Sequence, residues 1–267
     1  MKRIFAPTGI ALVVCALAFA QDDGRIVVPS RNSTRPRVVD VATTNGSITV
    51  RVSEGKDVVV ESGSIRSRRD MQAPPGMHRL DVPNRGLEVQ EQDNTITVRD
   101  HSPGGGDSIT ITVPVDTSLH LRSSNGSIYV DGVHGEVDAE AHNGGMKILN
   151  VSGSVLANTH NATVIVTMDR VDPGKPSAFS TLNGSIDVTL PADLKATLKM
   201  TTDNGSIYSD FDVNVSAGRA VTQPNNTSDG RYRVRFDRTI QGAINGGGGA
   251  DLTFRSANGS ITIRKKK

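Results

Sequence analysis

The sequence predicts an all-β fold built as a β-solenoid, in which coils of roughly 18–22 residues stack on one another. Three observations lead to this prediction. An eight-residue motif recurs along the chain, apolar and polar residues alternate on both sides of it, and a second apolar turn follows several of its copies. One such unit buries too little apolar surface to fold alone, so the units must share a core.

The recurring motif is centred on the tetrapeptide Asn-Gly-Ser-Ile. Clear copies begin at Asn45, Asn125, Asn183, Asn204 and Asn258, and looser copies begin at Ser62, Asp93, Asn143 and Asn161. The spacing is 18 residues from Asn125 to Asn143 and 18 again to Asn161, followed by 22 and 21. This spacing suits one turn of a solenoid whose neighbouring turns lie about 4.8 Å apart. Stacking at that distance would align the asparagines in a ladder of hydrogen bonds.

The residues on either side of each Asn-Gly corner alternate with the period of a half-buried strand. The third residue after the asparagine is apolar in every regular unit. We therefore expect one continuous buried row made of Ile128, Met146, Val164, Ile186 and Ile207. The residue two positions before the asparagine is small or hydroxylated.

Asn-Gly between alternating strands is also the strongest short hairpin signal, so an antiparallel β-meander or sandwich is the alternative fold. Two details favour the coil. Ala162 replaces the glycine in one corner, where a hairpin turn would need a positive φ. The second corners carry Val133, Val151 and Val171, which a short third side would point inward. Among the insertions, the segment at 99–107 is expected to join the strands at 95–98 and 108–113 as a hairpin.

The first twenty residues predict a signal peptide. A basic start at Lys2 and Arg3 precedes a short apolar run that ends in Ala18-Phe19-Ala20. Cys15 lies inside this run and is expected to leave with it. The predicted organisation is a signal peptide at 1–20, a flexible arm at 21–37, the solenoid domain at 38–264 and a basic tail at 265–267. No transmembrane segment is expected in the mature chain.

Charge argues against a nucleic-acid partner. Without Lys2 and Arg3 the chain carries 28 basic and 28 acidic residues, so the calculated pI of 8.8 is not evidence for nucleic-acid binding. Basic tails such as the one at Lys265, Lys266 and Lys267 are usually solvated.

The runs at 109–114, 119–130 and 135–144 resemble a bacterial family of exported β-strand repeat proteins, the putative-adhesin family, which is related to toastrack envelope domains. The resemblance covers residues 37–264. It implies a single-stranded, right-handed β-helix and no established catalytic or cofactor-binding residues. This chain departs from the family pattern at Ala162 and in the long insertion after Asn204.

Few residues suggest chemistry. His142 and His160 occupy equivalent positions in adjacent coils, and with Glu140 they are weak candidates for a Zn²⁺-like ion. A polysaccharide-active site would need carboxylates aligned across coils, but the outward acids Asp138 and Glu140 fall in a single coil. The glycine-rich segments lack the residues of a phosphate loop. We therefore predict no catalytic residues, no metal and no cofactor.

The function predicted from the sequence is an exported, non-catalytic structural or interaction module of adhesin-like type. It would act in the periplasm, at the cell surface or outside the cell, on an envelope protein or glycan. A periplasmic domain that senses envelope stress is the alternative, and a β-helical polysaccharide-active enzyme is a further one. Sugar-binding clefts favour aromatic platforms, and only Tyr129 and Tyr208 stand at regular outward positions.

Overall fold

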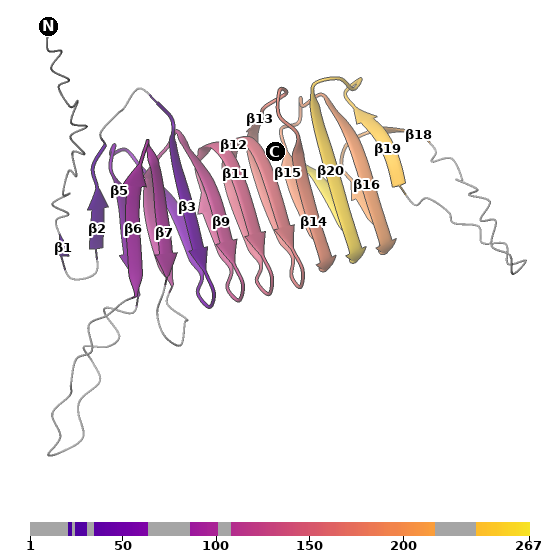
Figure 1. Ribbon diagram of the computed structural model, residues 1–267. Coiled ribbons are helices and arrows are strands. Elements are labelled where there is room, and N and C mark those ends of the chain that lie inside the picture. Colours follow the sequence, from indigo (N-terminus) through magenta and orange to yellow (C-terminus); the bar gives the residue numbers. More distant parts are fainter. Residues whose placement is uncertain (1–20, 23–24, 31–34, 64–85, 101–107, 217–238) are drawn as a thin grey trace, which may run out of the picture.

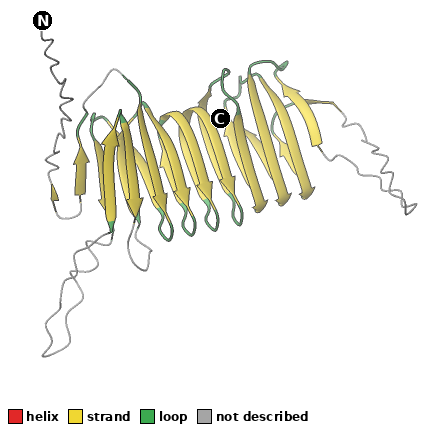
Figure 2. Ribbon diagram, in the orientation of Figure 1, coloured by secondary structure: helices red, strands yellow, loops and turns green. Residues whose placement is uncertain are grey.

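A computed structural model describes residues 21–22, 25–30, 35–63, 86–100, 108–216 and 239–267. The described chain is all-β and contains no helix (Figure 2). Its 21 strands belong to one sheet, which wraps almost completely around an apolar core like a barrel. The predicted signal peptide lies outside the described residues, as does the segment 217–238 of the insertion between Asn204 and Asn258.

The sheet has two long faces, each formed by strands that lie side by side (Figure 1). In spatial order, the first face contains β6 (Leu87–Gln92), β7 (Thr95–Asp100), β3 (Arg37–Thr43), β9 (Thr117–Ser123), β11 (His134–Ala141), the second half of β12 (Met146–Thr159), β14 (Ser177–Asn183), β20 (Ala250–Asn258), β16 (Ala196–Asn204), β19 (Thr239–Ile244) and β18 (Val213–Ser216). The second face contains β1 (Gln21–Asp22), β2 (Arg25–Val28), β5 (Val58–Ser62), β8 (Ile109–Pro114), β4 (Ile48–Ser53), β10 (Ile128–Asp131), the first half of β12, β13 (Val164–Val171), β15 (Ile186–Leu190), β21 (Ile261–Lys265) and β17 (Ile207–Ser209).

The two strands that flank an Asn-Gly corner belong to different faces. β9 and β10 are joined at Asn125-Gly126, but β9 pairs with β3 and β11, whereas β10 pairs with β4 and β12. All of these pairings are parallel and bring equivalent positions of neighbouring units side by side. Among the described strands, antiparallel pairs occur only toward the two ends of the stack. The Asn-Gly corners therefore do not form hairpins.

The predicted core row is buried, but its order differs from the prediction. Ile128, Met146, Val164 and Ile186 are at most 1% exposed. Ile186 pairs with Ile261, and Ile261 pairs in turn with Ile207, which is only partly buried. The C-terminal unit has entered the stack between two units that are consecutive in the sequence, and Figure 1 places the C-terminus near the middle of the molecule. The prediction that Ile186 and Ile207 are neighbours was wrong.

The corner glycines are needed because the backbones of neighbouring units pack closely there. None of Gly126, Gly144, Gly184, Gly205 and Gly259 has a positive φ. A Cβ atom on any of them would lie within the van der Waals radius of a carbonyl oxygen in the next unit. Glycine is therefore required at these corners for the close approach of neighbouring backbones, and not because the turn needs a positive φ.

The inward hydroxyls of the corners satisfy the carbonyls that this stacking buries. Ser123 donates to the carbonyl of Gly46 at 3.0 Å, and Ser256 donates to that of Gly184 at 3.0 Å. Thr159, Thr181 and Thr202 make equivalent bonds. Thr43 Oγ1 is buried and has no hydrogen-bond partner among the described residues.

A short third side connects the two faces, as the apolar second corners predict. Val133 and Val151 are fully buried there, and Val171 is 6% exposed. β12 runs from one face to the other through this side without interruption. Asn150 and Gly153 have positive φ values of 52° and 139°, which let the strand bend while it stays paired.

The N-terminal end of the stack differs from the expected hairpin at 95–98 and 108–113. β7 pairs with β6 through a turn at Asp93 and Asn94, whose φ values of 50° and 66° match a two-residue hairpin turn. β8 pairs instead with β4 and β5 on the other face. Asp93-Asn94 looks like the repeated motif in sequence but is a true hairpin turn.

Both chain ends are held to the stack in their described parts. Within the expected flexible arm, β2 pairs with β5, and Val28 is fully buried. In the basic tail, the ammonium group of Lys265 lies 5.2 Å from the ring centroid of Phe211, and Lys266 pairs with Asp169. These contacts hold residues 25–28 and 265–266 beside the core.

Candidate functional site

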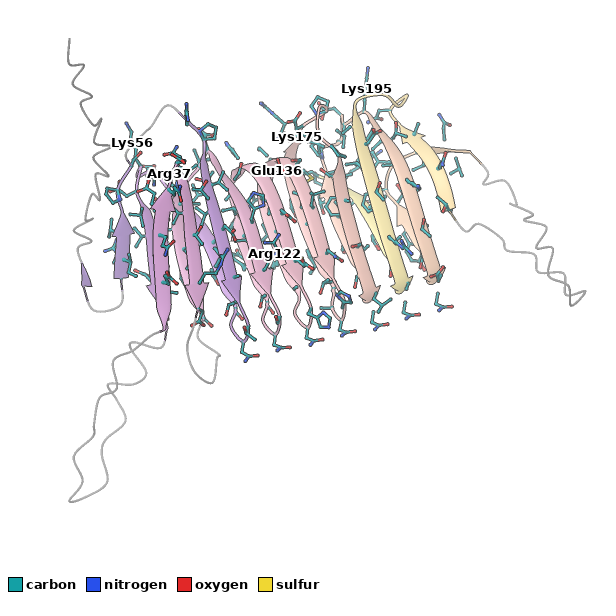
Figure 3. All side chains as sticks on the ribbon, in the orientation of Figure 1. Arg37, Lys56, Arg122, Glu136, Lys175 and Lys195 are labelled. Atoms are coloured by element: carbon teal, nitrogen blue, oxygen red, sulfur yellow. The ribbon has the colours of Figure 1, made fainter. Side chains whose placement is uncertain are left out.

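A hollow lies at the edge opposite the Asn-Gly corners. This corner groove has a volume of about 780 Å³ and is open to solvent. Its walls come from the segments 35–37, 53–56, 114–118, 134–136 and 172–175. Figure 3 shows Arg37, Lys56, Glu136 and Lys175 along this edge of the molecule.

The groove exists because the third side of the stack stops there. On this side, backbone hydrogen bonds form rungs between successive units. Asp172, Ser152 and His134 donate these bonds in turn, and the last one ends at the carbonyl of Val115. In the next unit the chain reverses after β4 and forms the antiparallel strand β5. No described third-side rung continues past Val115, and a gap remains.

Small residues keep the floor of the groove open. Ser118, Gly135, Gly153 and Ser154 line it. A Cβ on Gly135 would clash with the carbonyl of Thr117, and one on Gly153 would clash with the carbonyl of Gly135. The close stacking that requires these glycines also removes the side chains that could fill the hollow.

One wall of the groove is fixed by an ion pair. Lys175 Nζ lies 2.8 Å from Glu136 Oε2, although Lys175 joins the stack 39 residues after its partner. The hydrogen bond to Glu136 raises the pKa of Lys175 above its ordinary value, with further Coulombic attraction from the same carboxylate. Asp172 accepts a hydrogen bond from the backbone of Gly174 at 2.9 Å, which orders the turn that carries Lys175.

Arg37 serves the opposite wall as a structural anchor. Only 5% of its side chain is exposed, and it donates to the carbonyls of Pro29 at 2.8 Å and Val28 at 3.5 Å. Its guanidinium also lies 3.8 Å from the buried carboxylate of Glu91. These contacts hold the end of β2 beside β3, so Arg37 shapes the groove and is not available as a ligand-binding cation.

Charges of both signs remain available at the groove. Arg35 and Lys56 are exposed, and neither side chain makes an ion pair within the described part of the chain. The exposed carboxylates of Glu54 and Asp116 stand near them. A bound molecule would therefore meet separate positive and negative groups above a floor of small polar residues.

A second hollow of about 660 Å³ lies on the first face over Ala42, Thr44 and Ser124. Two arginines flank it, and both are already paired. Arg99 binds Asp40 in a bidentate manner at 3.1 and 3.0 Å, and Arg122 lies 3.5 Å from Glu140. Because these charges are matched within the protein, this face groove offers less to a charged ligand.

The predicted metal candidates are brought together only in part. The rings of His142 and His160 have centroids 4.3 Å apart and are tilted by 36°. Glu140 forms an ion pair with Arg122 of β9, which lies on the side of β11 away from His160. Within the described ranges, no three His, Cys, Asp or Glu side chains are arranged to hold a metal ion. The outward rows also place His120 beside Asp138, at 3.5 Å.

Sequence reasoning missed the corner groove entirely. The sequence pattern identifies the segments Gly132–Gly135 and Asn150–Gly153 only as second corners with inward valines. The signal that could have revealed the groove is the change of direction after β4. That change depends on pairing between strands far apart in the sequence.

No protein-family model matches the chain, and no curated protein matches it. Among solved structures, it is similar to a putative cell adhesion protein from Clostridium sporogenes, at 10% identity over 91% of this chain and 99% of the other, with a TM-score of 0.38. It is also similar to a putative adhesin from Bacteroides fragilis, at 13% identity over 92% and 98% of the two chains, with a TM-score of 0.29. Because both the sequence identities and the TM-scores are low, the description of the fold rests on the strand pairing of this chain alone. Membership of the putative-adhesin family stays a hypothesis.

In the part of the chain that the structure describes, no helix is long and apolar enough to span a membrane.

Proposed function

We propose that this protein is an exported, non-catalytic interaction module of adhesin-like type, wound as a right-handed β-solenoid, which binds a charged envelope glycan in the corner groove. Export is supported by the signal-peptide pattern at 1–20. The right-handed winding is supported by the parallel register of successive units and by the short third side that connects the faces.

The observation that carries the proposal is the composition of the corner groove. Its volume of about 780 Å³ falls within the usual range for ligand sites. Arg35, Lys56, Glu54 and Asp116 are exposed at the groove, above a floor of serine and glycine. Such a surface suits a hydrated chain that carries both acidic and amino groups, since each could find an opposite charge.

A glycan fits this groove better than a protein partner does. The centres of protein interfaces are usually apolar and rich in aromatic side chains. The described lining of the corner groove contains no aromatic ring besides that of His134. Neutral sugars that stack on aromatic platforms are disfavoured for the same reason, which leaves charged glycans as the best match.

The rigidity of the stack supports a binding role. The groove is lined by separate stretches of chain between residues 30 and 175, and the strand ladder fixes their relative positions before any ligand arrives. A preorganised site loses less conformational entropy on binding than a flexible one. Shallow, open contacts of this type favour affinity built from several weak interactions.

The test is to measure binding of the purified protein to a panel of envelope glycans that includes acidic, amino and neutral chains, together with turnover of the same glycans. We expect saturable binding to chains that carry charged groups, with no turnover. Binding only to an envelope protein would reject the glycan assignment. Robust turnover that is lost on changing Glu54 or Asp116 would show that the groove is an enzyme site.

A further inference from the structure

Seven corner asparagines, six of them followed by glycine and Asn161 followed by Ala162, form one continuous hydrogen-bonded ladder along an exposed edge. In spatial order the ladder runs from Asn45 through Asn125, Asn143, Asn161, Asn183 and Asn258 to Asn204. Each of the six side-chain bonds joins an Nδ2 donor to an Oδ1 acceptor over 2.7–2.9 Å. The ladder follows the stack and not the sequence, because Asn258 lies between Asn183 and Asn204.

All six bonds point in the same direction, so the two ends of the ladder differ from its interior. Each interior amide both donates to one neighbour and accepts from the other. Asn45 only accepts, from Asn125, and Asn204 only donates, to Asn258. In the described chain, Asn45 Nδ2 and Asn204 Oδ1 have no further hydrogen-bond partner.

An asparagine followed by glycine is chemically labile. The backbone nitrogen of the glycine attacks Cγ of the asparagine and forms an N–Cγ bond, which closes a five-membered succinimide. The Cγ–Nδ2 bond breaks, and the amide nitrogen leaves as ammonia with the proton that the glycine nitrogen loses. Water then opens the ring at either carbonyl, giving aspartate or isoaspartate.

The ladder opposes this reaction where an asparagine makes two bonds. The side chain must rotate to bring Cγ toward the next backbone nitrogen, and each ladder bond resists that rotation. At two interior corners the glycine nitrogen is also engaged, since Gly184 donates to the carbonyl of Asn258 at 3.1 Å and Gly259 to that of Asn204 at 3.0 Å. Asn161 is followed by Ala162, which attacks more slowly than glycine.

We propose that Asn45 and Asn204, the two ends of the ladder, are the sites of spontaneous deamidation in the folded protein. The interior Asn-Gly pairs at Asn125, Asn143, Asn183 and Asn258 are protected by their second bond. Asn245-Gly246 lies outside the ladder and is held separately, because its Nδ2 donates to the carbonyls of Ala192 and Leu194 at 3.1 and 2.8 Å. This modification does not depend on the proposed binding function.

The experiment compares deamidation in the folded and the urea-unfolded full chain by peptide mapping and mass spectrometry after incubation at mildly alkaline pH. In urea every Asn-Gly pair should react at a similar rate. In the folded protein Asn45 and Asn204 should react about fivefold faster than the interior pairs, as one additional hydrogen bond implies. Equal rates at ends and interior in the folded chain, or faster reaction inside, would overturn the proposal.

A variant provides an independent check. Asn204→Ala removes the last rung and turns Asn258 into an end of the ladder. Deamidation at Asn258 should then rise about fivefold, whereas the rate at Asn143, four rungs from Asn204, should stay the same. An unchanged rate at Asn258 in a variant that remains folded would show that the ladder bonds do not protect the interior asparagines.

Discussion

Ile186 lies in register beside Ile261, 75 residues further along the chain, and not beside Ile207 of the next unit in sequence. On the other face the same insertion places Phe254 against Phe179, with ring centroids 5.1 Å apart. The last two strands of the protein, β20 and β21, therefore lie within the stack and not at its end. Among the described strands, β14 and β16 each pair with β20 and not with each other.

This order can be tested with paired cysteines on the first face. Ala178 is in register with Thr253, and Thr253 is in register with Lys199. Because neighbouring strands lie about 4.8 Å apart, cysteines at 178 and 253 are within disulfide range. The pair Ala178→Cys and Thr253→Cys should cross-link under mild oxidation, as seen on a non-reducing gel.

The matched control is Ala178→Cys with Lys199→Cys, the pair that strict sequence order would bring together. These positions are two strands apart, so no intramolecular cross-link should form. Efficient cross-linking of this control pair would contradict the inserted position of β20.

The corner glycines predict a second outcome. Gly126→Ala should destabilise the protein by about 1–3 kcal/mol, since the new methyl group meets the backbone of Gly46 and the stacked units must move apart. Gly63→Ala is the control, because its Cβ would lie 3.6 Å from the nearest atom, in ordinary contact. Urea unfolding of the two variants measures the difference. Equal stability would argue against close stacking at the corner.

The direction of the asparagine ladder predicts that aspartate is tolerated at one end only. Asn45→Asp keeps an acceptor for Asn125 and should change stability by less than about 0.5 kcal/mol. Asn204→Asp replaces the donor with an acceptor that faces Asn258 Oδ1, and should cost about 1–2 kcal/mol. Thermal or urea unfolding distinguishes them, and the reverse order would mean that the ladder points the other way.

Tyr129 provides a prediction that depends on pH. Partial burial raises its pKa above the ordinary value of 10.0, and the hydrogen bond to Asp131 at 3.1 Å raises it further. A raised pKa means that the neutral phenol is favoured by folding. The contribution of the neutral phenol to the free energy of unfolding is therefore complete below pH 10, and it is lost as the pH rises through the higher pKa of the folded state.

Ultraviolet titration of the wild type and of Tyr129→Phe isolates this phenol. We expect Tyr129 to ionise above pH 10.0, and Asp131→Asn to lower its pKa only in part, because burial is the larger cause. Ionisation of Tyr129 at or below its ordinary value would contradict the described surroundings of the side chain.

Much of the fold could be predicted from local patterns. Alternation around each Asn-Gly corner identifies the buried residues, and Val133 and Val151 indicate the third side correctly. The order of the units could not be predicted, because Ile207 and Ile261 occupy equivalent positions in nearly identical motifs. Which of them pairs with Ile186 depends on the path of the chain between them, which local periodicity does not encode.

The candidate site was harder to predict than the fold for the same reason. His142 and His160 were correctly placed side by side, since both lie in regular units of equal spacing. Lys56 and Lys175 line one groove only because β5 reverses direction and ends the third side. Motifs of a single repeat contain no information about where the repeat stops.

The measurement that tests the central claim most directly is the affinity of Lys56→Glu and Lys195→Glu for a charged envelope glycan that the wild type binds. Both lysines are exposed and lie on the same edge of the molecule, but Lys195 is at its far end, outside the corner groove (Figure 3). Binding in the groove predicts that Lys56→Glu weakens affinity at least about fivefold, whereas Lys195→Glu leaves it unchanged. Equal affinities of the two variants would contradict a binding site in the corner groove.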